Sequence, residues 1–322
     1  MVHFQTTTAA LFFAFLAALA DDTTLSTDIV GCTDLGCPTH PWDSCTVADN
    51  TYVGVGLTRI ADVPDALDGI SLVKGVNISL PGPGGVGDPV TSQTRPYNSV
   101  YYLGTPRDLD VGSVSGCAVV FNDPPSRTFV SGDLNSTGIQ EGSGTCPDVI
   151  EQSCIAKLTE QAQNVNYSGS GACSALERQL RSHAPDECSD FAGAGNGLGN
   201  FTVASLGGLS SISGSQNSTS DCWPILPKSD NLAQFARDTA MGGYTATADL
   251  TEVYKITPIL TVFTAGNGSL VNNTSAQLTC LKIVTTLNPN APGVAQGAAP
   301  LSTSNLVGVS AAALATVMFT VL

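Results

Sequence analysis

Residues 70–80, ISLVKGVNISL, carry apolar side chains mostly at every second position. A period of two predicts a β-strand with one buried face. Similar runs of strand residues occur at 52–55, 100–103, 118–121 and 128–130. They are separated by clusters of Gly, Pro, Asn and Asp, clearest at 80–85 and 122–125, which are typical of turns. We therefore expect residues 51–130 to form an antiparallel, layered β region.

The period changes between Cys146 and Cys188. Four residues recur at intervals of four, which predicts a helix of about four turns; they are Ile150, Cys154, Leu158 and Ala162. Pro147 lies where a first helical turn tolerates proline. A second helix is expected from Ser174 to Ala184, since Ser174 and Glu177 fit a capping box and Pro185 follows. Residues 146–188 therefore predict a helical hairpin inserted between β regions.

The second half of the chain contains a loop and a further β region. Residues 193–219 are rich in Gly, Ser and Asn without a charged side chain, and we expect a glycosylated loop there. Strand patterns return at 253–263 and 278–287 within a β region over 241–286. The predicted fold class is α+β, mainly antiparallel β with an inserted, disulfide-stapled helical hairpin.

Ten cysteines, an even number, predict five disulfides in an oxidising compartment. They are Cys32, Cys37, Cys45, Cys117, Cys146, Cys154, Cys173, Cys188, Cys222 and Cys280. Spacing alone leaves their connectivity open. The four cysteines of the helical insert are expected to tie its helices to each other or to the sheet. A zinc site at Cys32, Cys37, His40 and Cys45 is the rival interpretation, but its spacing fits no paired C-x2-C pattern.

The first twenty residues are expected to be a secretory signal peptide. An apolar run at 9–19 ends in Ala18-Leu19-Ala20, and Asp21-Asp22 follow. This pattern is typical of a cleaved signal. A membrane anchor is the rival interpretation, but the run is shorter than the roughly 20 apolar residues that span a bilayer. The mature ectodomain is then predicted over 21–286.

The C-terminal residues are typical of a glycosylphosphatidylinositol (GPI) attachment signal. Gly297 and the two alanines after it are the small residues of such a site, followed by a polar spacer and an apolar tail at 306–322. Gly297 is the expected attachment residue and Gly293 the second choice. Residues 287–305 would be the tether and spacer. A transmembrane tail is the rival interpretation, but neither Lys nor Arg flanks it to set an orientation.

Eight N-x-S/T sequons support secretion. Their asparagines are Asn77, Asn135, Asn166, Asn200, Asn217, Asn267, Asn272 and Asn273. The last two overlap, so we do not expect both to carry a glycan. Occupied sequons must lie on the surface, so these positions predict exposed segments.

The formal net charge is -15, and every charged side chain lies between Asp21 and Lys282. Nucleic acid is excluded as a partner, since binding it requires clustered Lys and Arg. The expected partners are the membrane, through a lipid anchor, and cell-wall polysaccharide or an extracellular protein.

The sequence offers few catalytic groups. Only His40 and His183 would remain after processing, and the chain contains no G-x-S-x-G motif to supply a nucleophile. The letters G-x-G-x-x-G occur at 82–87, but prolines prevent the helix that a dinucleotide site needs. We expect no catalytic residue, cofactor or metal. A glycosidase remains the alternative, since two carboxylates from different strands need no local motif.

The chain resembles GPI-anchored surface glycoproteins of filamentous fungi. The resemblance rests on the alanine-rich signal, the Cys-rich ectodomain, the many sequons, the Pro/Gly/Ala/Ser tether and the apolar tail. It does not extend to glucan-remodelling transglycosylases, whose E-x-D-x-E type signature is absent. It implies a location on the outer face of the plasma membrane or in the cell wall. The expected function is non-enzymatic: wall organisation, adhesion or ligand binding; the alternative is a glycosidase or transglycosylase acting on cell-wall polysaccharide.

Overall fold

The computed structural model describes residues 29–32, 34–37, 45–78, 94–123, 144–167, 171–191, 197–212, 220, 222–228, 230–243, 251–266 and 268–284. Several predictions lie outside these residues. They concern the signal peptide (1–20), the strand at 128–130, the tether (287–305) with Gly297, the tail (306–322), His40, Asn135, Asn217 and Asn267.

Two four-stranded antiparallel sheets form the body of the protein. The first sheet has the order β3–β4–β5–β8, with β3 at Gly54–Arg59, β4 at Ser71–Ile78, β5 at Thr94–Thr105 and β8 at Asn231–Gly243. The second sheet has the order β10–β9–β6–β7, with β6 at Gly116–Phe121, β7 at Phe201–Ser205, β9 at Thr257–Phe263 and β10 at Ser275–Leu281. The mainly antiparallel β prediction is confirmed.

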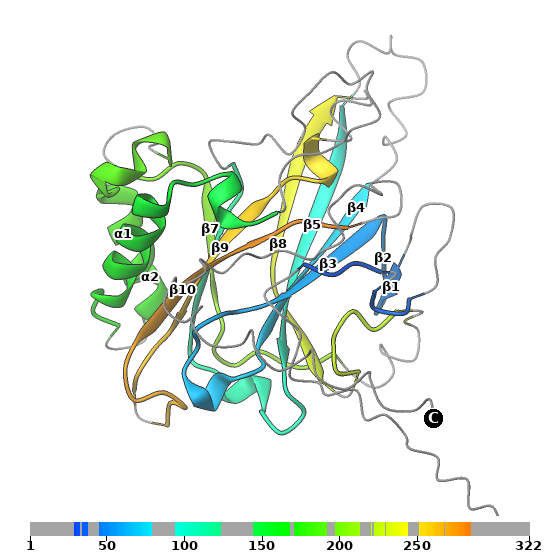
Figure 1. Cartoon of the computed structure of the whole chain (residues 1–322), viewed down its shortest axis with the longest axis horizontal. Coiled ribbons are helices and arrows are strands. Elements are labelled where there is room, and N and C mark those ends of the chain that lie inside the picture. Colours follow the sequence, from blue (N-terminus) through cyan, green and yellow to red (C-terminus); the bar gives the residue numbers. More distant parts are fainter. Residues whose placement is uncertain are drawn as a thin grey trace, which may run out of the picture.

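The two sheets pack face to face, as Figure 1 shows. Alternate residues of each strand meet between them, for example Leu72 and Tyr101 of the first sheet with Ile259 and Phe263 of the second. All four side chains are buried. Burial of this apolar area stabilises the fold by roughly 25 cal/mol per Å² removed from water. The alternation of apolar residues along each strand therefore determines which face of the sheet points inward.

The helical insert covers the outer face of the second sheet (Figure 1). Helix α1 spans Gln152–Gln163 and helix α2 spans Ala172–Ser182. Leu158, Leu176 and Leu180 pack in one cluster with residues of β6 and β9 such as Val119. The predicted apolar face of α1 is confirmed, although Ile150 lies before the helix begins. Among the described residues, short 3-10 helices accompany these elements: η2 (Asp65–Leu67), η4 (Val111–Ser113), η5 (Cys146–Asp148) and η6 (Asp186–Phe191).

A two-stranded ladder covers the opposite face of the first sheet. It consists of β1 (Cys45–Val47) and β2 (Asn50–Tyr52). The Tyr52 ring lies against Gly75 of β4, where a Cβ atom would come within 2.8 Å of the ring. The hydroxyl groups of Tyr52 and Tyr102 are hydrogen-bonded to each other. Gly75 therefore leaves the space that this tyrosine pair fills.

The five predicted disulfides are present, and no cysteine is free. Three hold the helical layer: Cys117–Cys173 joins β6 to α2, Cys146–Cys280 joins η5 to β10, and Cys154–Cys188 joins α1 to η6. Two hold the N-terminal segment and the β1–β2 ladder: Cys32–Cys45 and Cys37–Cys222. The insert is therefore stapled both internally and to the sheet.

The predicted capping box at Ser174 is wrong. Helix α2 begins at Ala172 with Gly171 as its N-cap, so Ser174 lies inside the first turn. The Cys117–Cys173 disulfide anchors this turn to β6, and tertiary packing overrides the local cap signal. The observed capping box precedes α1, where Asp148 accepts hydrogen bonds from the backbone N–H and the hydroxyl of Thr145.

The strand boundaries of the second half differ from the prediction. Strand β7 lies inside the expected loop at 193–219, because Phe201 and Val203 pack against the helical layer. Strand β8 begins at Asn231, before the β region expected over 241–286. Strand β9 begins at Thr257 instead of 253, and β10 spans 275–281 instead of 278–287. Among the described residues, no helix is long and apolar enough to cross a bilayer.

Candidate functional site

A groove of about 600 Å³ lies between the two helices of the insert. Its polar side chains come from both helices and the residues after α1: Gln161, Asn164, Asn166, Arg178, Gln179 and Ser182. Val165 and Ala175 add apolar surface. The groove forms because residues three and four apart on a helix share one face, and the turn after α1 lets α2 return beside it. This volume lies within the range of about 300–1,000 Å³ that small-molecule sites occupy.

Gln161 lines the groove and has a buried acceptor. Its Nε2 donates a hydrogen bond of 2.7 Å to the His183 carbonyl at the end of α2. Its Oε1 atom is buried and has no hydrogen-bond partner within the described part of the chain. A buried acceptor without a partner costs about 1–3 kcal/mol of desolvation. Gln161 therefore bridges the helices with its amide nitrogen, while its oxygen is enclosed without a partner among the described residues.

Arg178 differs from the other cations of the hairpin. Arg181 pairs with Glu177 at 2.9 Å, and Lys157 pairs with Glu160 at 2.7 Å. Among the described residues, no carboxylate forms an ion pair with Arg178. Its guanidinium is exposed at the groove. In a chain with a net charge of -15, this is a cation with its hydrogen-bond donors open to a ligand.

The groove offers binding groups without acid–base pairs. Its described lining contains amides, a guanidinium and a hydroxyl, and neither a carboxylate nor an imidazole. Ser182 does contact His183, with Oγ 2.7 Å from Nδ1. The Ser182 hydroxyl, however, donates to the Arg178 carbonyl at 2.7 Å. Since a hydroxyl has one proton, it can donate to only one of these two acceptors at a time, and the roles in the Ser182–His183 contact depend on the tautomer of the imidazole.

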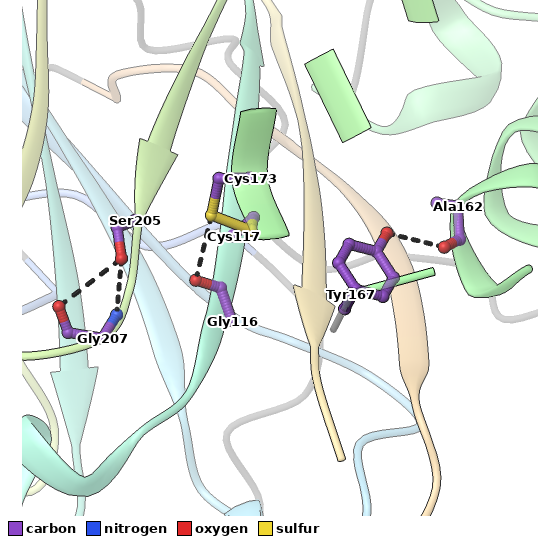
Figure 2. Close-up of a disulfide and its surroundings, with 7 residues drawn as sticks. All are labelled: Gly116, Cys117, Ala162, Tyr167, Cys173, Ser205 and Gly207. Atoms are coloured by element: carbon purple, nitrogen blue, oxygen red, sulfur yellow. Dashed lines mark hydrogen bonds between the residues drawn. A yellow bond between two sulfur atoms is a disulfide. The ribbon is translucent and has the colours of Figure 1, made fainter. Parts of the chain in front are cut away.

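A second hollow, of about 280 Å³, lies beside the Cys117–Cys173 disulfide. Figure 2 shows this disulfide with its neighbours Gly116, Ser205 and Gly207. Its hydroxyl groups are those of Ser115, Ser174, Ser205 and Thr264. The Ser205 hydroxyl accepts a hydrogen bond of 3.1 Å from the Gly207 backbone N–H. None of the described lining residues is His, Asp or Glu, so these hydroxyls have no base beside them.

The most perturbed basic group lies between the sheets. Lys74 on β4 is fully buried, and its Nζ donates to the Lys255 carbonyl at 2.9 Å and to Thr257 Oγ1 at 3.0 Å. Burial, and then the positive charge of Lys255, lower the pKa of Lys74 to about 7. Perturbed pKa values often mark functional sites. Lys74 has no exposed surface for a substrate to reach, so its role is structural.

The structure shows how exposed the described glycosylation asparagines are. Among the described sequons, Asn166, Asn200, Asn272 and Asn273 are exposed, whereas Asn77 is half-buried.

The sulfurs of Cys37, Cys45 and Cys222 lie within 4.8 Å of one another. All three belong to disulfides, and so does Cys32, so the thiolates of the rival zinc site do not exist in this state.

Sequence reasoning missed the groove. One signal was present: Gln161 and Asn164 are three apart, and Arg178 and Ser182 are four apart, so each pair lies on one helical face. Nothing in the sequence indicated that the two faces meet. Comparison with protein-family models, curated proteins and solved structures gave no match.

Proposed function

We propose that this protein is an extracellular glycoprotein, held by a GPI anchor on the outer face of the plasma membrane or in the cell wall, with a non-enzymatic role. Wall organisation, adhesion and ligand binding are the forms of that role. Its partners would be wall polysaccharide or another extracellular protein.

The observation that carries this proposal is the disulfide framework. All ten cysteines are paired, and the five bridges hold the layers on both outer faces of the sandwich. Such a framework persists in oxidising compartments and is rare in the cytosol. The exposed positions of Asn166, Asn200 and Asn272 support glycosylation at the surface. The two terminal apolar runs in the sequence fit a secretory signal peptide and a GPI attachment signal, whose tail is removed when the lipid is attached.

The two hollows favour binding over turnover. A glycosidase requires two carboxylates about 5–10 Å apart across the scissile bond. Neither hollow has a carboxylate among its described lining residues. The glycosidase or transglycosylase alternative would therefore need a different site, and no described feature favours it.

A combined binding and turnover screen tests the proposal. The full mature protein, purified in detergent, would be incubated with wall glucans, chitin and mannan, followed by a binding assay and product analysis. The proposal expects binding of a wall component or of an extracellular protein, without products. Released or rearranged sugar products that disappear when a paired carboxylate is neutralised would overturn the non-enzymatic role.

A further inference from the structure

We propose that the groove between α1 and α2 is a saccharide-binding site, and that Arg178 favours a saccharide with an acidic substituent. This inference rests on the proposed extracellular role, which it deepens by naming the site and the class of ligand. Its three supports are the bridge that Gln161 forms between the two helices, the donors and acceptors that line the groove, and a sequon at the edge of the groove.

The first support is Gln161. Its Oε1 is buried without a partner, while its Nε2 is held by the His183 carbonyl. This hydrogen bond bridges the two helices, and the Oε1 atom has almost no accessible surface, so Gln161 shapes the groove rather than contacting the ligand with this oxygen. Saccharides present many hydroxyls, each both a donor and an acceptor, which match the amides that line the groove around Gln161.

The second support is the pairing of donors and acceptors around the groove. Asn164 and Gln179 carry amides at its lining, and an amide offers two donors and one acceptor oxygen. Arg178 adds a planar group of donors that can bind a carboxylate or phosphate in two places. Val165 and Ala175 supply apolar surface for the carbon face of a sugar ring. This mixture fits a hydroxyl-rich ligand better than an apolar one.

The third support is Asn166, which is exposed and belongs to the described lining of the groove. A glycan on this asparagine would begin at the edge of the site. The same chemistry could therefore reach the groove from two sources: the protein's own glycan at Asn166 or an external glycan. Both are saccharides, and experiment can separate them.

The test uses the full mature protein in detergent, with and without an Asn166→Gln substitution. Binding of mannotriose, chitotriose and a phosphorylated mannan fragment would be measured by calorimetry, and backbone hydrogen exchange would be followed over 152–182. The variants Gln161→Met and Arg178→Ala alter the groove. Lys157→Ala is the matched control, because it removes an exposed cation of the same hairpin that does not line the groove.

An external ligand would bind the wild-type protein and the Asn166→Gln variant equally. The proposal then expects each groove variant to lose about five- to tenfold in affinity, the loss of about one hydrogen bond, with the phosphorylated fragment affected most by Arg178→Ala. The Lys157→Ala control should bind like the wild type. If the protein's own glycan is the ligand, the backbone amides of both helices should exchange hydrogen faster in the Asn166→Gln variant than in the wild type. The variant should also bind external saccharide more tightly than the wild type does.

The proposal is overturned if no saccharide binds either protein and the Asn166→Gln substitution leaves hydrogen exchange unchanged. Equal affinity of all groove variants for a bound saccharide would also overturn it. Neither result would affect the anchoring and secretion in the proposed function, which are measured on intact membranes.

Discussion

Lys74 of the first sheet donates a hydrogen bond of 3.0 Å to Thr257 of the second sheet, at a point where both side chains are fully buried. It also donates to the Lys255 carbonyl. An amine between two apolar sheets satisfies polar groups of the opposite sheet, but its charged form is costly to bury. The sandwich therefore joins its layers with a group whose charge depends on pH.

This arrangement predicts a pH-dependent stability. The pKa of Lys74 is about 7 in the folded protein, against about 10.4 in an unfolded chain. Between these values the unfolded state binds more protons, so the free energy of unfolding rises with pH. Below pH 7 both states are protonated, and the cost of burying the charge is fully present. We expect a rise of roughly 1–4 kcal/mol between pH 7 and pH 10.

The Lys74→Met substitution should flatten this rise, as measured by denaturant unfolding at several pH values. The free energy of unfolding of this variant should still rise somewhat with pH, because burial also lowers the pKa of Lys282 and of Lys228. Lys157→Met is the control, since Lys157 is exposed on α1. If the free energy of unfolding rose with pH as steeply in Lys74→Met as in the wild type, Lys74 would not titrate between pH 7 and pH 10.

The disulfide between α1 and η6 should stabilise the helical layer. Replacing Cys154 and Cys188 together with alanine is expected to lower the free energy of unfolding by roughly 2–5 kcal/mol, the usual cost of losing a native disulfide. The double substitution leaves no free thiol to form other pairs. Thermal unfolding of the purified protein measures the effect. An unchanged melting temperature would contradict the stabilisation expected from the Cys154–Cys188 disulfide.

Gly75 should not tolerate a side chain. A Cβ atom there would lie 2.8 Å from the Tyr52 ring, which is itself held by its hydrogen bond to Tyr102. We expect Gly75→Ala to destabilise the protein by roughly 1–3 kcal/mol through overpacking. Gly243→Ala is the matched control, because no described heavy atom lies within 4 Å of its Cβ position. Equal denaturation midpoints for the two variants would contradict the contact.

Sequon occupancy should follow exposure. Asn166 and one of the pair Asn272 and Asn273 are expected to carry glycans, because their side chains are exposed. Asn77 is half-buried on β4, and its Nδ2 donates to the Thr51 carbonyl at 2.6 Å. We expect Asn77 to be unmodified. Peptide mass spectrometry after enzymatic deglycosylation in heavy-oxygen water measures each site; a glycan at Asn77 with none at Asn166 would contradict this order.

Some of the fold could be predicted from sequence because its signals are local. The alternation around residues 70–80 identified β4, and the four-residue spacing around Leu158 identified α1. Strand β8 was missed for two reasons. Alanines such as Ala233, Ala236 and Ala240 are typical of helices, and several residues of the strand, such as Arg237, are exposed. Its pairing with β5, a long-range interaction, decides its conformation.

The disulfide pairs and the groove depend on the same long-range packing. Cysteine number predicted five bridges, but Cys37 and Cys222 are 185 residues apart, and no local signal connects them. The groove exists because α2 lies beside α1, which places Arg178 near Gln161. The buried position of Lys74 could not be predicted either, since a lysine on a strand usually faces solvent.

Release by a phospholipase tests the proposed GPI anchor directly. Intact cells or membranes would be treated with phosphatidylinositol-specific phospholipase C, after chemical removal of any acyl group on the inositol. We predict that the protein moves to the soluble fraction together with a known GPI-anchored control. Retention in the membrane while the control is released would contradict the anchor and indicate a transmembrane tail.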